Sequence, residues 1–103
     1  MAIYEMRTYT LYVGKMAEAV RIYREHPWYE AVQDKLVGYF QGDVGGMNQI
    51  IHLWKFEDDA DRRRHWDAVF ADPAFIEFAG RFRPLILKQE NKLLLAAPWG
   101  PHP

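Results

Sequence analysis

The sequence predicts an α+β domain in which an antiparallel sheet carries its helices on one face. The first observation behind this is the order of extended and helical segments along the chain, which is βαββαβ. The second is the length of 103 residues, which suits one hydrophobic core. The third is a composition of 50% hydrophobic and 26% charged residues, the balance of a folded globular protein. We therefore expect a single domain over residues 1–103.

The first half of the chain supplies a strand and a helix that proline ends. Residues 3–9 are rich in β-branched and aromatic types and alternate in side-chain character, which indicates a strand. After Gly14, apolar residues recur at helical spacing from Met16 to Tyr23. Pro27 lacks an amide hydrogen, so this helix should stop before a short helical segment over 28–35.

The second half should supply a hairpin, two helices and a last strand. Gly45-Gly46 suits a tight reversal between two extended segments. Aspartates at the start of the next segment favour a helix N-terminus, and Asp72-Pro73 favours a second helix start that Pro84 brings to an end. The expected elements are strands at 37–44, 48–56 and 85–95 and helices at 59–71 and 73–83.

This order of elements is typical of a ferredoxin-like antiparallel sheet with helices on one face. In the segment 48–56, Ile51 and Leu53 point one way while Trp54 and Phe56 point the other. A sheet that is apolar on both faces must cover the second one, and the chain supplies no further elements for this. We therefore expect the bare face to pack against a second copy of the chain in a homodimer.

Composition excludes several classes of function. Thirteen Lys and Arg against fourteen Asp and Glu leave a net charge of −1, which offers no basic field to nucleic acid. Cysteine and serine are absent, so thiolate metal sites and serine nucleophiles are excluded. No apolar run approaches the roughly 18 residues of a membrane span, and the first residues lack a leader pattern. We expect a cytoplasmic protein with neither nucleic acid nor membrane insertion.

Several segments of the chain form a familiar set: the opening YEMRTYTL followed by GK, the central LVGYF and GMNQIIHLW, the helix with RRR, the ADPAF restart and the late QENKLLLAAPW. Together they resemble the NIPSNAP family, a branch of the dimeric α+β barrel proteins. The resemblance covers about residues 3–99. Met6 and Tyr12-Val13 depart from the family's commoner residues. The resemblance implies a ferredoxin-like monomer whose sheet joins a partner sheet in a shared barrel.

For function, the resemblance leaves three hypotheses open. Animal relatives are linked to mitochondria and to vesicle transport or mitophagy signalling, which suggests a protein-interaction module. The wider superfamily includes cofactor-independent monooxygenases, lyase-like enzymes and haem proteins, so a monooxygenase or an isomerase or lyase remains open. The interpretation that we favour is a small homodimer that binds a small organic molecule in its barrel cavity.

Polar and aromatic residues on two strands form the candidate site. Glu5, Arg7 and Tyr9 share one face of the first strand, and His52 and Trp54 share one face of the third. We expect both sets on the face turned away from the helices, where they would line a polar and aromatic cavity. They could instead form a paired network that only fixes strand order and dimer register.

The candidate residues carry distinct expected roles. His52 would be a general acid or base, and Arg7 would bind an anionic or enolate oxygen. Tyr9 and Trp54 would form an aromatic wall, with Glu5 and Tyr39 as further ligand-binding residues. The four histidines show no metal-binding spacing, so we expect neither a metal nor a cofactor.

Two other polar groups are open to more than one interpretation. Arg62, Arg63 and Arg64 follow a run of aspartates, so they should form a self-neutralised, solvated helix face. Gln89 and Asn91 lie in the last strand, whose register the sequence does not fix. We expect these strand residues at an exposed edge or in cross-strand pairs.

Overall fold

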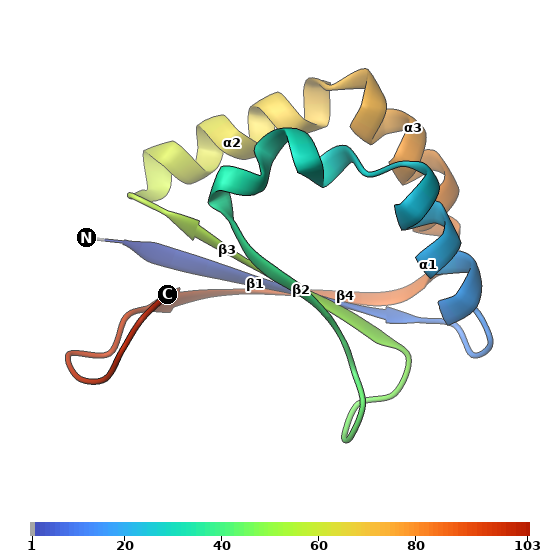
Figure 1. Cartoon of the computed structure of the whole chain (residues 1–103), viewed down its shortest axis with the longest axis horizontal. Helices are drawn as coiled ribbons and strands as arrows, with labels where there is room; N and C mark the ends of the chain where they lie inside the picture. Colours follow the sequence, from blue (N-terminus) through green and yellow to red (C-terminus); the bar gives the residue numbers. More distant parts are fainter. Residues whose placement is uncertain (1) are drawn as a thin grey trace.

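The computed structural model describes residues 2–103. Four strands form one sheet in the order β2-β3-β1-β4, and each neighbouring pair is antiparallel. The helical segments lie together on one side of this sheet, while its other side is open (Figure 1). The elements are β1 (Ile3–Leu11), α1 (Met16–Glu25), η1 (Trp28–Lys35), β2 (Leu36–Gln41), β3 (Gln49–Phe56), α2 (Asp59–Ala71), α3 (Pro73–Phe82), η2 (Arg83–Leu85) and β4 (Ile86–Leu95).

The α+β fold class expected from the sequence is confirmed, and the local signals act as their chemistry suggests. The carboxylate of Asp58 accepts a hydrogen bond from the amide of Asp61 at 2.8 Å and so caps α2. Asp72 caps α3 through the amide of Ala74 at 3.0 Å, with Pro73 in the first turn. Asp72 also ends α2, so this one residue separates α2 from α3.

Strand register brings the candidate residues of β1 and β3 onto one face. Glu5 lies opposite Trp54 and Arg7 lies opposite His52. This face is the one that the helices cover, because Glu5 accepts a hydrogen bond from Trp66 of α2. The prediction that these residues line the open face is therefore wrong.

The physical reason is that a helix supplies the partners that make polar burial tolerable. A buried carboxylate is stable only when it is paired and hydrogen-bonded. Arg62 of α2 donates to Glu5 at 2.7 Å, although the sequence suggested a solvated side chain. Its neighbour Arg63 does pair on the surface with Asp59, at 2.6 Å. The arginine run is thus divided between the interior and the helix surface.

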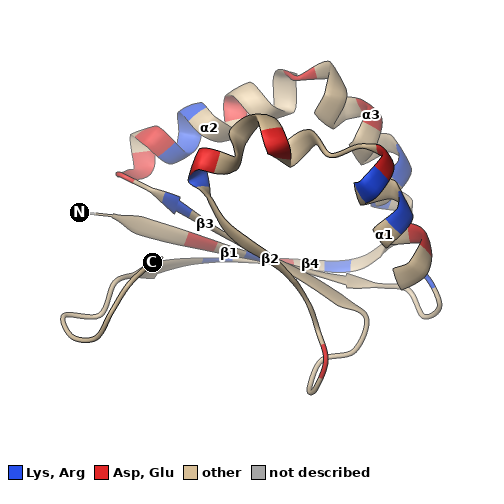
Figure 2. Cartoon of the chain, in the orientation of Figure 1, with Lys and Arg blue, Asp and Glu red and all other residues tan. Residues whose placement is uncertain are grey.

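The hydrophobic core lies between the helices and the inner face of the sheet. It is rich in aromatic side chains, with the rings of Trp28 and Trp54 stacked at 6.1 Å between centroids. Charged residues gather on the helices and are sparse on the sheet (Figure 2). The buried ion pair of Glu5 and Arg7 on β1 is therefore an exception to the general distribution.

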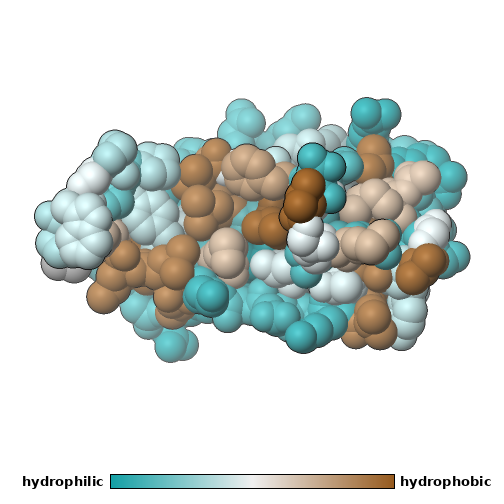
Figure 3. Space-filling model, turned by 90° about the horizontal axis from the view of Figure 1, so that it is seen from below, coloured by the Kyte–Doolittle hydropathy of each residue, from teal (hydrophilic) through white to brown (hydrophobic). Residues whose placement is uncertain are grey.

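The open face carries apolar side chains in its centre. Met6, Ile51 and Leu53 are half-buried there, and brown patches cover much of this face (Figure 3). One end is covered by the chain itself, since the hydroxyl of Tyr4 donates to the carbonyl oxygen of Pro103 at 2.7 Å. Phe40 of β2 and Leu94 of β4 also point to this side and remain exposed.

The edge strand β4 is exposed along most of its length. Leu93 and Leu95 point to the helix side of the sheet by their register with β1, yet they are 52% and 71% exposed. Leu94 points to the open side and is 36% exposed. The expected apolar residues in both phases of this strand are present, and the helices cover neither phase.

Candidate functional site

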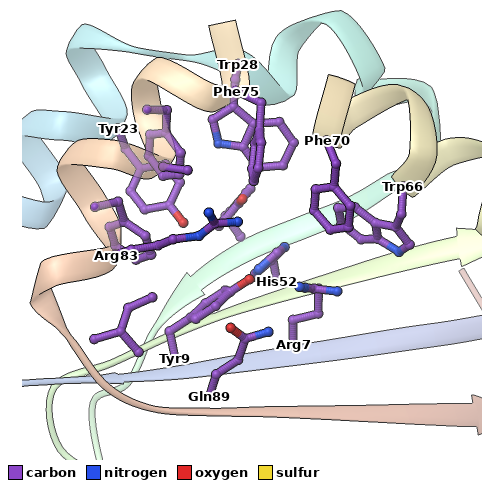
Figure 4. Close-up of a pocket in the computed structure, with 15 residues that line it drawn as sticks. Arg7, Tyr9, Tyr23, Trp28, His52, Trp66, Phe70, Phe75, Arg83 and Gln89 are labelled. Atoms are coloured by element: carbon purple, nitrogen blue, oxygen red, sulfur yellow. Dashed lines mark hydrogen bonds between the residues drawn. The ribbon is translucent and has the colours of Figure 1, made fainter. Parts of the chain in front are cut away.

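A cavity of about 240 Å³ lies between the sheet and the helices, and it collects most of the candidate residues. Arg7, Tyr9 and His52 rise into it from the sheet, while Tyr23, Trp28, Trp66 and Phe75 come from the helical layer (Figure 4). The exposed Arg83 and Gln89 also line it. Its aromatic walls are formed by Tyr9, Tyr23, Trp28, Tyr39, Trp66, Phe70, Phe75, Phe78 and Phe82.

Arg7 is held rigidly at the floor of this cavity. Its Nη1 donates to Glu5 Oε2 at 2.8 Å, and its Nε donates to the hydroxyl of Tyr9 at 3.1 Å. The guanidinium also lies 4.4 Å from the ring centroid of Trp66, a cation–π contact. With three fixed contacts, this cation keeps one orientation toward the cavity.

Glu5 lies behind Arg7 and organises it. The side chain is fully buried and accepts from Arg7, Arg62 and the indole of Trp66. Burial alone would raise the pKa of Glu5, but these hydrogen bonds and the charge of Arg7 outweigh burial and lower the pKa. Glu5 is therefore ionised and accepts hydrogen bonds on both carboxylate oxygens, which suits a structural anchor.

His52 is clamped between two tyrosine rings. Its imidazole stacks on Tyr9 at 5.2 Å and 13° and on Tyr39 at 4.6 Å and 9°. The indole Nε1 of Trp54 donates to Nδ1 of His52 at 2.6 Å. Burial, with a contribution from the charge of Arg7, holds the pKa of His52 well below its ordinary value of 6.5. The imidazole is consequently neutral at pH 7.

Three residues that line the cavity carry a buried polar atom without a hydrogen-bond partner among residues 2–103. These atoms are Nε1 of Trp28, the hydroxyl oxygen of Tyr39 and Nε2 of His52. Burial also raises the pKa of Tyr39 well above its ordinary value, so its hydroxyl stays protonated. All three atoms thus belong to residues that line the cavity and have unused hydrogen-bonding capacity.

His65 of α2 also has an unpartnered Nε2 within the described part of the chain. Its ring packs against Trp54, Phe56 and Trp66 at centroid distances of 4.7, 5.1 and 4.5 Å. It does not line the cavity. We therefore interpret His65 as a packed core histidine.

A second hollow of about 430 Å³ lies beside the first, at the β2 edge. It is bounded by residues of α1, η1, β2 and β3, and it shares the side chains of Tyr23 and Tyr39 with the first cavity. The two tyrosines therefore form the partition between the hollows. Of the three unpartnered cavity atoms, only the hydroxyl of Tyr39 belongs to both, so the first cavity is the better candidate site.

The structure brings together four of the six residues singled out from the sequence. Arg7, Tyr9, Tyr39 and His52 line the cavity. Glu5 and Trp54 lie behind it, where each binds a residue that lines it. The roles assigned to these residues stay predictions.

Sequence reasoning missed the helical half of the site. Tyr23, Trp28 and Trp66 look like ordinary core residues on apolar helix stripes, and no spacing distinguishes a cavity wall from a packed core. Gln89 was noted for its polarity in a strand, which is the signal that could have placed it here. Its register with Tyr9 brings it to the cavity.

Within residues 2–103, no group of three His, Asp or Glu side chains is placed to hold a metal ion. No helix in the same range is long and apolar enough to cross a membrane. The cytoplasmic location stays a prediction.

Comparison with known proteins identifies relatives of this chain. The NIPSNAP family model matches residues 4–101. Protein NipSnap homolog 3A of Homo sapiens is 33% identical over 98 residues, which cover 93% of this chain and 40% of that protein. The chain thus spans less than half the length of this relative.

Solved structures share the fold. A NIPSNAP family protein from Agrobacterium tumefaciens superposes with a TM-score of 0.90 at 31% identity, over 98% of both chains. SnoaB, a cofactor-independent oxygenase from Streptomyces nogalater, superposes with a TM-score of 0.66 at 20% identity, again over 98% of both chains. The likeness to SnoaB establishes a common fold alone.

Proposed function

The chain belongs to the NIPSNAP family, and from that premise we propose that it binds a small planar organic molecule in the cavity between sheet and helices. The observation that carries this proposal is the set of unpartnered polar atoms on Trp28, Tyr39 and His52 around one aromatic-walled cavity. Each buried polar group left unpaired costs about 1–3 kcal/mol. A ligand that pairs with these atoms recovers that cost.

The size and lining of the cavity limit the ligand. Small-molecule sites usually enclose roughly 300–1,000 Å³, and this one encloses about 240 Å³. A molecule of one or two rings fits such a space. Aromatic walls favour a flat molecule, because stacked and edge-to-face contacts are the preferred geometries between rings.

A ligand screen by thermal unfolding tests this proposal. One- and two-ring compounds with oxygen substituents should raise the unfolding temperature, since a ligand at about 100 times its Kd adds about 2.7 kcal/mol of stability. Ala79 lines the cavity and is 3% exposed, so Ala79→Leu should fill the space and abolish the effect. Ala68→Leu, on the exposed side of α2, should preserve it.

Two results together would remove the binding proposal. The first is that no compound of the panel shifts the unfolding temperature. The second is that native mass spectrometry of the protein from its own host shows no bound small molecule. The protein-interaction alternative would then be the one to pursue, by capture of partners on the intact protein.

We further propose that the open face of the sheet is the interface of a homodimer. Met6, Ile51 and Leu53 form an apolar centre on that face, and a contiguous apolar patch on a surface favours association. Light scattering across a dilution series should give about twice the mass of the 12.2 kDa chain. A folded monomer at micromolar concentration would contradict the proposal.

A second candidate function is cofactor-independent oxygenation of an electron-rich carbonyl compound. It is favoured by the fixed cation of Arg7 beside the unpartnered Nε2 of His52, because two such groups can stabilise an enolate oxygen. Oxygen uptake with quinol or polyketide-like compounds tests it. Arg7→Ala and His52→Ala should each lower turnover by roughly 100-fold, and absence of uptake with every compound would remove this candidate.

A further inference from the structure

The hydrogen bond between Trp54 and His52 determines what His52 is able to do. An indole nitrogen only donates, so the imidazole nitrogen that faces it must accept. Trp54 Nε1 lies 2.6 Å from His52 Nδ1, so Nδ1 carries no hydrogen. In a neutral imidazole the hydrogen then sits on Nε2. The unpartnered Nε2 of His52, a residue that lines the cavity, is therefore an N–H donor and not a base.

We propose that His52 donates its Nε2 hydrogen to an anionic oxygen of the ligand, and that Trp54 is the positioning residue that fixes this tautomer. The ligand class is a planar phenolate or enolate. This inference rests on the proposed function, since it names the chemical class that the same cavity accepts.

The other groups around the cavity favour an anion. Among the described residues that line it, Arg7 and Arg83 are cationic and none is aspartate or glutamate. Trp28 adds another donor whose hydrogen has no partner in residues 2–103. A site with these donors and no buried carboxylate facing it binds an oxygen anion better than a neutral acceptor.

The groups that surround His52 keep its imidazole neutral. Arg7 and Tyr9 face it from β1, Tyr39 faces it from β2, and Tyr23 of α1 lines the same cavity. The nearby carboxylate, Glu5, is already bound by two arginines and an indole. Protonation of Nδ1 would break the bond from Trp54 and place a second cation beside Arg7.

His52 is unable to take a proton from a bound ligand. With Nδ1 engaged and Nε2 protonated, His52 has no lone pair for a ligand proton. The ligand must therefore reach the bound state by losing its proton to solvent. Molecules whose hydroxyl ionises near neutral pH are the ones that the cavity selects.

The compound 4-nitrophenol is a direct probe, because its absorption spectrum distinguishes the phenol from the phenolate and its ionisation falls near neutral pH. Titration of the intact protein with this compound across the ionisation range gives the affinity for each form. We expect the phenolate to bind about tenfold or more tightly than the phenol, the effect of a charge-assisted hydrogen bond. The bound compound should accordingly ionise at a lower pH than the free compound.

Two substitutions at position 52 separate the donor from the shape. His52→Phe keeps a flat ring between Tyr9 and Tyr39 and removes the donor, so the preference for phenolate should fall by about tenfold. His52→Gln retains an N–H donor and should restore most of the preference. Equal preference in the wild type and His52→Phe would overturn the proposal.

The role of Trp54 has its own readout. In long-range ¹H–¹⁵N spectra the wild-type His52 should show a protonated Nε2 and a bare Nδ1, with its signals assigned by their loss in His52→Phe or His52→Gln. Trp54→Phe should produce a mixture of both tautomers, whereas Trp99→Phe in the exposed tail should not. A protonated Nδ1 in the wild type would overturn the proposal even if Trp54→Phe does not fold.

The outcomes separate this inference from the function on which it rests. Binding of 4-nitrophenol without preference for its ionised form would overturn the anion and tautomer argument and leave small-molecule binding intact. Failure of 4-nitrophenol and of every compound in the panel to bind would count against the cavity as a binding site and so against both.

Discussion

The two faces of the sheet differ in which side chains they bury and in what covers them. On the helix-covered face, the carboxylate of Glu5 is fully buried because α2 supplies Arg62 and Trp66 to bind it. On the open face, Met6 and Leu53 are apolar but only half-buried. Polarity in a strand therefore does not indicate which face is exposed, because partners brought by a helix decide where polar groups lie.

The largest expected effect comes from breaking the polar network of the covered face. Glu5→Gln leaves Arg7 and Arg62 without their buried counter-charge. Loss of one partner of a buried ion pair costs about 3–5 kcal/mol, and urea unfolding should show a loss of this size. As a control, Glu77→Gln removes an exposed pair with Arg81 and should leave the midpoint unchanged. Equal losses of unfolding free energy in both variants would mean that the buried network stabilises the fold no more than an exposed ion pair does.

On the open face, the expected effect is on association and not on folding. Leu53→Lys places a charge in the apolar centre, so the dimer dissociation constant should rise by about 30-fold or more, equivalent to ~2 kcal/mol at an interface centre. Light scattering measures this, and circular dichroism should show an unchanged fold. Val13→Lys adds the same charge in an exposed turn and should leave the mass unaltered. If the Leu53→Lys variant were both monomeric and unfolded, the open face would be needed for folding, which would contradict its assignment to association alone.

The covered face should also make stability depend on pH. Burial, with Arg7, lowers the pKa of His52 well below 6.5, so the unfolded chain binds more protons below that pH than the folded chain does. The free energy of unfolding should therefore fall as the pH drops below 6.5, by up to about 1.4 kcal/mol per pH unit for one histidine. Urea unfolding at about pH 7 and about pH 5 measures this fall.

His52→Gln should reduce that slope without abolishing it, because burial also lowers the pKa of His65 and acts in the same direction. His102, in the exposed tail, provides the matched control, and His102→Gln should leave the slope unchanged. An identical slope in the wild type and His52→Gln would show that His52 is not held neutral by its surroundings.

The smallest expected change in the free energy of unfolding is neutral or a gain, and not a loss. Tyr39→Phe removes a buried hydroxyl that has no partner among residues 2–103, so stability without ligand should stay equal or rise by up to about 1 kcal/mol. The same substitution should weaken binding of compounds found in the ligand screen. A clear loss of stability in the unliganded protein would show that the hydroxyl already has a structural role.

Much of the fold follows from local patterns. The elements and their order could be predicted because their signals lie within short stretches of sequence. These signals are the alternation along β1 and β3 and the helix caps at Asp58 and Asp72. The spacing of His52 and Trp54, two residues apart in one strand, also placed them correctly on a common face. These signals depend on neighbours in sequence.

The covered site depends instead on contacts between distant elements. Glu5 and Trp66 are 61 positions apart, and nothing in either segment indicates that they meet. Trp28 is recognisable as apolar, but its unpartnered Nε1 appears only when η1 is packed on the sheet. The direction of the bond between Trp54 and His52 likewise follows from side-chain geometry and not from spacing.

The most direct test of the covered face as the ligand site uses the indole N–H signals of the tryptophans in a ¹H–¹⁵N spectrum during titration with 4-nitrophenol. Trp28 lines the cavity with an unpartnered donor, and Trp66 lines it with its N–H bound to Glu5. Trp54 lies behind the cavity, bound to His52, and Trp99 is 75% exposed in the tail. If the ligand binds in this cavity, the Trp28 signal should move most and saturate with binding, while the Trp99 signal stays in place. Saturable binding that leaves the Trp28 signal unmoved would contradict the covered face as the ligand site.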